Sequence, residues 1–376
     1  MRTASTLVRL SFAALATPWV APLPAQLPNS GQHLVAANWD GRLHVVDAQD
    51  GSHELLASAG MGQNCLARDP AERLWSTARL PNGTAFSFHL ALIDPVARSS
   101  ALMFPSLDLR GLARAPGGLY GIETQPSGLT SRLWHIDTQT GQHTLRGPVG
   151  LTAIQSLAVV GNTLYGWHWV QGLVVLDPNT GAAADPFPAT ANNVLLQWLC
   201  ETPGGGLLGG TSTGLYDVDL GTGGLTLRTA LVPPLDLRGA EFAAFALPFG
   251  RGCEITSGPI TLGALGVLQA GRTVTLLSSN HLPNSLRALA VGFSREQFRG
   301  QSLPAPIDAL IGTPGCSLHV SPDLTQFYGA SGFPTSVMAL PLPLIAGLGE
   351  VYVQVFDFGQ PFGRGAASNG LWLHLR

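Results

Sequence analysis

The chain has 376 residues and a net charge of −3, with 45% hydrophobic and 11% charged residues. This composition is too apolar for a disordered chain, and it lacks the basic field that nucleic acid or an anionic membrane would need. All 20 basic side chains are arginine, which excludes a Schiff-base lysine and the phosphate-binding lysine of a P-loop.

The N-terminal residues have the pattern of a signal peptide. Arg2 and Arg9 supply a basic region, residues 10–16 are apolar, and a small-residue cleavage site ends at Ala25. Later apolar runs are broken by Gly, Pro, Asp or Arg, and are shorter than the roughly 20 residues of a spanning helix. We therefore expect residues 1–25 to be a signal peptide. The mature protein is expected to have no membrane span and to be secreted, periplasmic or attached to the cell surface.

Residues 30–248 contain a repeat with a period of about 40 to 47 residues. Each unit ends a strand of alternating apolar residues with an aspartate, and a turn that usually contains glycine follows. The aspartates are Asp47, Asp94, Asp137, Asp177 and Asp219. This is the period of four-stranded β-propeller blades. The pattern predicts five blades, or six if two blades have been counted as one.

The first repeat lacks an inner strand, and a matching strand appears at the far end. Residues 235–239 read Leu-Asp-Leu-Arg-Gly, the same sequence as residues 107–111, which open an inner strand. We therefore expect residues 238–244 to pair with the N-terminal strand. Such pairing closes the ring and removes exposed sheet edges.

The repeat resembles the PQQ, NHL and WD40-like superfamily of β-propellers over about residues 30–248, although the Trp-Asp ending of WD40 blades is absent. The resemblance implies the propeller fold. It also implies that ligands bind at the face formed by two classes of loop. One class enters the inner strands, and the other joins second to third strands. A propeller has no single function, so the fold alone does not define the ligand.

Residues 252–376 are predicted to form a second all-β domain, a β-sandwich or jelly roll, because strand candidates alternate with Gly and Pro clusters. This part is similar to the C-terminal β-domains of exported bacterial proteins, which implies an adhesion, sorting or carbohydrate-facing role. We expect a disulfide between Cys253 and Cys316, since both lie in this domain of an exported chain. Cys65 and Cys200 are expected to be small buried residues.

The predicted ligand-binding residues lie in the two classes of loop at one face of the propeller. They are Asp108, Arg110, His168, Trp169, Asp236 and Arg238. Aspartate and arginine two apart in a strand share a face, so the two Asp-Leu-Arg pairs either tie down loops or line the channel mouth. Two tryptophans flank His168 in a hairpin, and an exposed indole can stack on a sugar ring.

Catalytic residues are not expected, and Glu201 and Glu241 are weak candidates because they lie within inner strands. The repeat aspartates are interpreted as turn residues that accept backbone N–H groups. The scattered histidines and the cysteine spacing predict no metal site, and we expect no cofactor. We expect the strand residues His44, His135 and His374 to face the exposed side of a sheet.

Three functions remain open at the level of sequence. The first is an exported, non-catalytic binding or interaction protein with a glycan, peptide or protein ligand on the propeller face. The second is an exported glycosidase-like hydrolase or lyase that uses carboxylates in the propeller channel. The third is a structural cell-surface protein. The oligomeric state is left open.

Overall fold

The computed structural model describes residues 33–82, 85–123, 130–190, 192–255, 258–331, 333–342, 349–359 and 364–375. The predicted signal peptide, residues 1–25, lies outside these ranges. The described chain is mostly strand, and its helix, α1 (Asp308–Ile311), has four residues. Within the described residues, no helix is long and apolar enough to cross a membrane. The predicted all-β class is confirmed.

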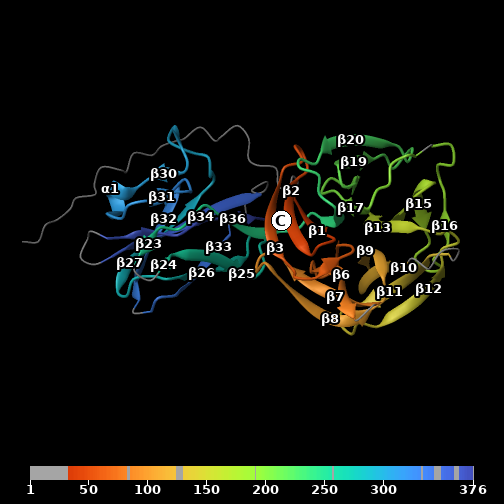
Figure 1. Ribbon diagram of the computed structural model, residues 1–376, viewed down its shortest axis with the longest axis horizontal. Helices are drawn as coiled ribbons and strands as arrows, with labels where there is room; N and C mark the ends of the chain where they lie inside the picture. Colours follow the sequence, from red (N-terminus) through yellow and green to blue (C-terminus); the bar gives the residue numbers. More distant parts are fainter. Residues whose placement is uncertain are drawn as a thin grey trace, which may run out of the picture.

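Small antiparallel sheets arranged around an axis form the N-terminal part (Figure 1). The described residues form five of these sheets, one for each sequence repeat. Their strands are β1 (His33–Asn38), β2 (Arg42–Asp47), β3 (His53–Ser58) and β21 (Leu237–Glu241); β4 (Gly62–Gln63), β5 (Ala67–Arg68), β6 (Leu74–Asn82), β7 (Ala85–Asp94) and β8 (Ser99–Ser106); β9 (Leu109–Ala115), β10 (Gly118–Glu123), β11 (Arg132–Asp137) and β12 (His143–Pro148); β13 (Ile154–Val160), β14 (Thr163–His168), β15 (Gly172–Leu176) and β16 (Ala183–Ala184); and β17 (Trp198–Glu201), β18 (Leu207–Gly210), β19 (Gly214–Val218) and β20 (Leu225–Ala230).

The ring of sheets is closed by a strand from far along the chain. β21 pairs antiparallel with β1, and Ala240 lies opposite Ala36, as the duplicated sequence predicted. The inner strands contact one another in the order β21, β5, β9, β13, β17 and back to β21. The N-terminal part is therefore a β-propeller in which the first sheet combines both ends of the repeat region.

The glycine that ends each Leu-Asp-Leu-Arg-Gly segment allows neighbouring inner strands to approach closely. A Cβ atom at Gly239 would lie 2.2 Å from the backbone nitrogen of Leu66, and one at Gly111 would lie 2.7 Å from that of Leu157. No side chain fits at these distances, because both neighbours are backbone atoms. The segment is duplicated at two places where sheets meet around the axis.

The C-terminal part begins earlier than predicted. β22 (Phe245–Phe249), which the sequence placed inside the propeller range 30–248, pairs with β36 (Gly370–His374), and Phe245 lies opposite His374. The physical reason is that β21 ends at Glu241, and three residues then take the chain out of the ring. Phe245 is fully buried at the junction of the two parts.

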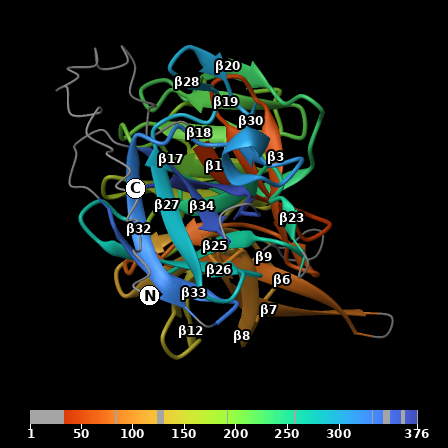
Figure 2. The ribbon, with the colours of Figure 1, turned by 90° about the vertical axis from the view of Figure 1, so that its left-hand side faces the viewer.

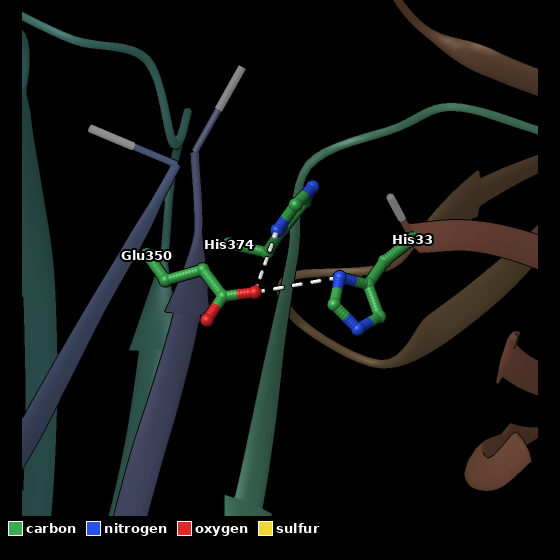
Figure 3. Close-up of side chains that lie close together, drawn as sticks. All are labelled: His33, Glu350 and His374. Carbon is green, nitrogen blue, oxygen red and sulfur yellow. Dashed lines mark ion pairs between the residues drawn. The ribbon is translucent and has the colours of Figure 1, made fainter. Parts of the chain in front are cut away.

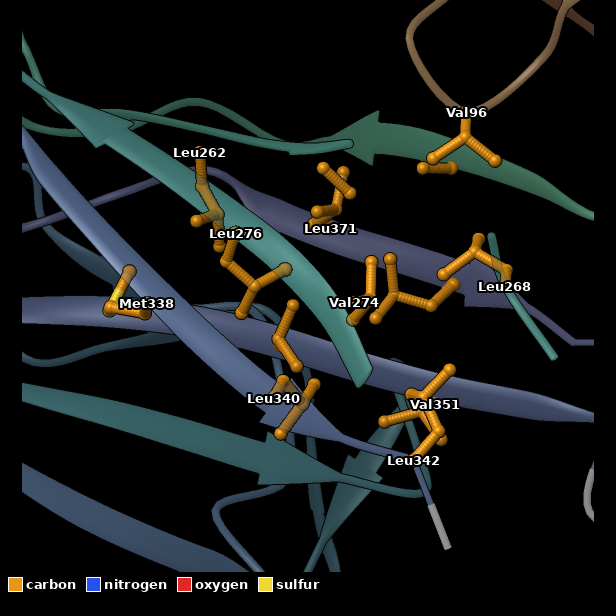
Figure 4. Close-up of a cluster of buried hydrophobic side chains, with 14 of the residues drawn as sticks. Val96, Leu262, Leu268, Val274, Leu276, Met338, Leu340, Leu342, Val351 and Leu371 are labelled. Atoms are coloured by element: carbon orange, nitrogen blue, oxygen red, sulfur yellow. The ribbon is translucent and has the colours of Figure 1, made fainter. Parts of the chain in front are cut away.

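Two facing sheets form the core of the C-terminal part, which is a β-sandwich. The larger sheet has the order β22, β36, β34 (Glu350–Phe358), β27 (Ser285–Gly292) and β32 (Leu324–Ser331), with β35 (Ala366–Ala367) beside β34. The smaller sheet has the order β25 (Thr261–Leu265), β26 (Thr273–Ser279) and β33 (Ser336–Pro341). Leu262, Leu276 and Leu340 of the smaller sheet pack against Val351 and Leu371 of the larger one (Figure 4). The other strands of this part pair in twos: β23 (Glu254–Ile255) with β24 (Gly258–Pro259), β28 (Gln297–Phe298) with β29 (Gln301–Ser302), and β30 (Ala305–Pro306) with β31 (Ser317–Leu318).

The propeller and the sandwich share a hydrophobic cluster. Val35 and Leu74 of the propeller pack together with Phe245, Tyr352 and Trp372 of the sandwich sheet. Figure 2 views the molecule from the sandwich side, with β27, β32 and β34 in front of the propeller strands. Because aliphatic side chains of the propeller are buried against aromatic side chains of the sandwich, the stability of the two parts is coupled.

Cys253 and Cys316 form the predicted disulfide, which joins the segment before β23 to the segment before β31. Cys65 and Cys200 are free, buried thiols, as expected. Burial raises the pKa of Cys65 to about 11 and also raises that of Cys200 well above its ordinary value. Both thiols are therefore protonated and unreactive at neutral pH.

Candidate functional site

The repeat aspartates stabilise turns, as their position at the end of a strand and before a turn predicted. Asp137 Oδ1 accepts the backbone N–H of Gln139 at 2.7 Å and that of Thr140 at 3.1 Å. These backbone hydrogen bonds lower the pKa of Asp137. Asp47, Asp94, Asp177 and Asp219 accept turn N–H groups in the same way. The aspartates are therefore structural, and the site must lie elsewhere.

The inner strands all run in the same direction along the propeller axis. Residues at the beginnings of these strands therefore lie at one end of the propeller, and residues at their ends lie at the other. Asp236 and Arg238 lie where β21 begins, and Glu241 lies where it ends. Asp236 and Glu241 are five residue steps apart along an extended chain, which corresponds to roughly 16 Å. The predicted ligand-binding pairs and the weak catalytic candidates are therefore at opposite ends of the channel.

Both Asp-Leu-Arg segments form internal ion pairs. Arg110 Nη2 donates to Asp108 Oδ2 at 3.0 Å, and Arg238 Nη2 donates to Asp236 Oδ2 at the same distance. An amide of the neighbouring sheet supports the first aspartate, because Asn64 Nδ2 donates to Asp108 Oδ1 at 3.0 Å. These side chains are 30–43% exposed, so the pairs contribute little stability and stay open to a ligand.

Three guanidinium groups surround Trp39, which lies in the turn between β1 and β2. The ring centroid is 4.8 Å from Arg79 Cζ, 4.9 Å from Arg238 Cζ and 6.0 Å from Arg110 Cζ. Arg79 also stacks on Phe86, with its Cζ 3.3 Å from that ring. We call Trp39, Arg79, Arg110 and Arg238 the arginine cluster.

The arginine cluster carries more positive than negative charge. Arg110 and Arg238 each have an aspartate partner, whereas Arg79 has no carboxylate partner among the residues that the structure describes. The Arg110 Nε–H is buried and makes no hydrogen bond within the described chain. The cluster therefore has one uncompensated positive charge. Trp39 and Arg79 lie in or near turns that join the second strand of a sheet to the third. This position in the sequence is the feature by which they could have been predicted as part of the site.

His168 and Trp169 are not part of the arginine cluster. His168 Nδ1 accepts the N–H of Gln171 at 3.0 Å, and burial lowers the pKa of this imidazole, so it holds the hairpin tip. Trp167 is fully buried, whereas Trp169 is 47% exposed. Of the predicted hairpin pair, Trp169 alone presents its ring to solvent.

A network of ion pairs lies where the inner strands end, opposite the Asp-Leu-Arg segments. Arg68 donates to Glu241 Oε2 at 3.2 Å and to Glu72 Oε2 at 2.6 Å, and Arg114 donates to Glu72 Oε1 at 2.9 Å. Burial raises the pKa of Glu241 to about 7, against the lowering effect of Arg68. Glu201 Oε1 accepts the N–H of Gly161 at 3.3 Å.

Glu201 and Glu241 line one cavity together with Arg68 and Arg114, but its volume is about 30 Å³. This volume holds about one water molecule and no sugar. A larger cavity of about 290 Å³ is lined by Glu201 and by His374 of the sandwich. The structure thus brings the two glutamates to one cavity without leaving room for a glycosidic bond between them.

Two of the three histidines expected on exposed sheet faces are buried. His44 is 6% exposed and packs edge-on against His53, with ring centroids 5.4 Å apart. His374 is 2% exposed, because β36 has the sandwich core on one face and the propeller on the other. Alternation along a strand predicts which residues share a face, but it cannot show that both faces are covered.

Comparison with protein families finds no match, and comparison with curated proteins finds none. Among solved structures, a chain of a nidogen/laminin complex is 13% identical to this one, with a TM-score of 0.39. The match covers 56% of this chain and 98% of that chain. A protein of unknown function from Bacteroides thetaiotaomicron is 10% identical, with 90% and 76% coverage and a TM-score of 0.35. A luciferin-regenerating enzyme is 13% identical, with 52% and 69% coverage and a TM-score of 0.34.

These similarities are too distant to carry function. The fold assignment rests on the sheets themselves, whose pairing and closure are those of a propeller followed by a sandwich. The chain is therefore an all-β protein that combines a β-propeller with a β-sandwich.

Proposed function

We propose that this chain is an exported, non-catalytic binding protein that binds an acidic polysaccharide at the propeller end bearing the arginine cluster. The observation that carries the proposal is the set of three guanidinium groups around Trp39, one of them without a carboxylate partner. The Cys253–Cys316 disulfide supports export, since disulfides persist in oxidising compartments. A relationship to the PQQ, NHL and WD40-like propellers remains a prediction.

The chemistry of the arginine cluster suits a carboxylate-bearing sugar. Guanidinium groups bind carboxylates with two parallel hydrogen bonds, and stacking on Trp39 holds them in place while their N–H edges stay available. Asp108 and Asp236 supply acceptors beside the arginines for the hydroxyl groups of a sugar ring. A surface that has both anion-binding donors and hydroxyl-binding acceptors favours a uronate over a purely acidic peptide.

Trp169 offers a second contact for an extended polymer. It belongs to a turn between a second and a third strand, the same class of turn as the one that holds Trp39. We expect Trp169→Ala to weaken polysaccharide retention by up to about tenfold, the loss of one sugar–indole contact, without changing the thermal midpoint. Affinity electrophoresis and a thermal melt of the same variant check both parts, and unchanged retention would remove Trp169 from the site.

The hydrolase alternative is less well supported. Glu241 and Glu72 are each paired with a guanidinium, and the cavity shared by Glu201 and Glu241 is about 30 Å³. The ion pair with Arg68 accounts for the buried carboxylate of Glu241 in structural terms. A structural cell-surface role would place the activity in the sandwich, and we find no grouping of side chains among its described residues that favours this role over binding at the arginine cluster.

The central experiment measures binding of polygalacturonate, an acidic polysaccharide, and of dextran, a neutral one, to the full mature chain. We expect polygalacturonate to bind and its affinity to fall with added salt, because the contacts are ionic. Arg110→Gln combined with Arg238→Gln should weaken binding at least about tenfold, since each lost charged hydrogen bond costs about 1.5–3 kcal/mol.

Arg228→Gln is the matched control. Arg228 pairs with Asp217 on an outer strand and is 32% exposed, close to the 33% and 30% of Arg110 and Arg238. Like Arg238→Gln alone, it removes one positive charge, but from another surface, and it should leave polygalacturonate binding unchanged. Equal losses in the control and the double variant would show a diffuse charge effect and contradict the site. If the protein binds poly-glutamate but not polygalacturonate, the ligand is an acidic peptide and the polysaccharide proposal is wrong.

A further inference from the structure

Three side chains from distant parts of the chain meet where the propeller joins the sandwich (Figure 3). His33 begins β1, Glu350 begins β34, and His374 ends β36. Glu350 and His374 lie directly opposite each other in the β34–β36 pair, so their side chains share one face of the sheet. His33 approaches that face from the propeller.

The geometry of the three side chains is that of a metal site. Glu350 Oε1 is 3.3 Å from His33 Nδ1 and 3.8 Å from His374 Nδ1, and the three ligand atoms all lie within 4.8 Å of one another. Tetrahedral Zn²⁺ holds nitrogen and oxygen ligands at about 2.0–2.2 Å, which places the ligand atoms roughly 3.3 Å apart. Small side-chain movements bring all three atoms to these distances.

The three atoms face one another, and within the described part of the chain none of them has a hydrogen-bond partner. His33 Nδ1, His374 Nδ1 and Glu350 Oε1 are each buried without a hydrogen bond among the described residues. The side chains of Glu350 and His374 are only 5% and 3% exposed. Leaving buried polar atoms unsatisfied costs about 1–3 kcal/mol each, so three that face one another indicate a missing common partner.

The surrounding residues orient the ligands. Tyr352 Oη donates to the second oxygen of Glu350 at 2.6 Å, which leaves Oε1 facing the imidazoles. The other ring nitrogen of His33, Nε2, lies 3.5 Å from Asp47 Oδ2, the arrangement in which a carboxylate sets the tautomer of a metal-binding histidine. Phe245 stacks on His374 with ring centroids 4.8 Å apart, which fixes the plane of that ring.

The local charge also favours a cation. Glu350 and Asp47 supply two carboxylates. A nearby guanidinium, that of Arg295, is stacked on Trp372 at 4.6 Å and paired with Glu54 at 3.7 Å. A divalent ion between the three ligand atoms offsets the buried carboxylate of Glu350. The His33 side chain is 14% exposed, so water can reach a fourth coordination position on its side.

We infer that His33, Glu350 and His374 bind a divalent cation of the zinc class that joins the first strand of the propeller to the last strand of the sandwich. Two imidazoles and one carboxylate form a ligand set that Zn²⁺ accepts, with a fourth position left for water. The inference is independent of the polysaccharide proposed above. No spacing motif signals the site in the sequence, because over 300 residues separate His33 from its partners.

The test uses the full mature chain without a histidine tag, stripped with a chelator and titrated with Zn²⁺ by calorimetry and with Co²⁺ by visible absorption. We expect one Zn²⁺ per chain, a tetrahedral Co²⁺ spectrum, and a thermal midpoint that rises with Zn²⁺. Glu350→Gln and His33→Gln should each weaken Zn²⁺ binding at least tenfold and abolish the Co²⁺ spectrum.

His135→Gln is the matched control, because it also removes one histidine from a propeller strand. The Nε2 atom of His135 is hydrogen-bonded to the carbonyl oxygen of Pro116 at 2.9 Å, so this histidine has a structural partner outside the proposed site. It should bind Zn²⁺ as the wild type does. If Glu350→Gln fails to fold, the Zn²⁺ affinity of His33→Gln is the test of the site, since His33 is the more exposed ligand. Failure of the wild type to bind Zn²⁺, or equal binding by wild type and both ligand variants, would overturn the inference.

Discussion

Gly239→Ala should lower the free energy of unfolding by about 3 kcal/mol, the upper range for forcing extra volume into a packed interior. The added Cβ would lie 2.2 Å from the nitrogen of Leu66 and 2.5 Å from the carbonyl carbon of Cys65. Both are backbone atoms of the next sheet, so neither can rotate away. The sheets must separate at the point where β21 closes the ring, and thermal unfolding followed by near-UV circular dichroism measures the loss.

The duplicated segment provides an internal comparison. Gly111→Ala should also destabilise the protein, because its Cβ would lie 2.7 Å from backbone atoms of Ser156 and Leu157. Gly204→Ala is the control, since the nearest atom to its Cβ is 4.0 Å away in the flexible side chain of Thr202. A melt of Gly239→Ala that coincides with that of Gly204→Ala would mean that the inner strands are not packed as described.

Glu241 should make the protein less stable as the pH rises from about 4.5 to about 7. Burial raises the pKa of Glu241 from 4.5 to about 7, so the folded state keeps this proton over a range in which the unfolded state has lost it. Folding then binds a proton, and the free energy of unfolding falls with increasing pH across that window. The difference of about 2.5 pKa units corresponds to roughly 3 kcal/mol.

Glu241→Gln removes the titrating group and should flatten this part of the profile, which makes the variant the more stable protein above pH 7. Arg68→Gln should have the opposite effect. Arg68 lowers the pKa of Glu241, and its loss leaves a buried carboxylate unpaired at high pH. Urea unfolding at a series of pH values measures all three profiles. Parallel curves for wild type and Glu241→Gln would show that Glu241 does not control the pH dependence.

Local patterns were enough to predict much of the architecture. The aspartate repeat has a period that four antiparallel strands require, and the copied Leu-Asp-Leu-Arg-Gly segment predicted that β21 would complete the first sheet. The turn role of the aspartates and the Cys253–Cys316 disulfide were also predicted correctly. Each of these follows from residues that are close in sequence or from the small number of cysteines.

The candidate sites needed the tertiary structure to different degrees. Turn position predicted which loops share a face, and so it found Arg110 and Arg238, but not that Trp39 would hold them together with Arg79. That contact depends on how adjacent sheets are rotated around the axis. The sequence left open whether Glu201 and Glu241 share a pocket with the Asp-Leu-Arg pairs, and only the structure placed them at the other ends of the inner strands. The pairing of Glu241 with Arg68 and the small volume of the cavity were likewise visible only in the structure.

The sequence by itself determined the repeat, the closed ring, the second β-domain and the disulfide, because each depends on periodicity or on residue type. Only the tertiary structure decided that β22 belongs to the sandwich, that His374 is buried, and that His33 and Glu350 lie beside it. The physical reason is that both faces of β36 are buried. One face packs in the sandwich core, and the other packs against a propeller strand more than 300 residues away in the sequence. Alternation within one strand carries no information about such a partner.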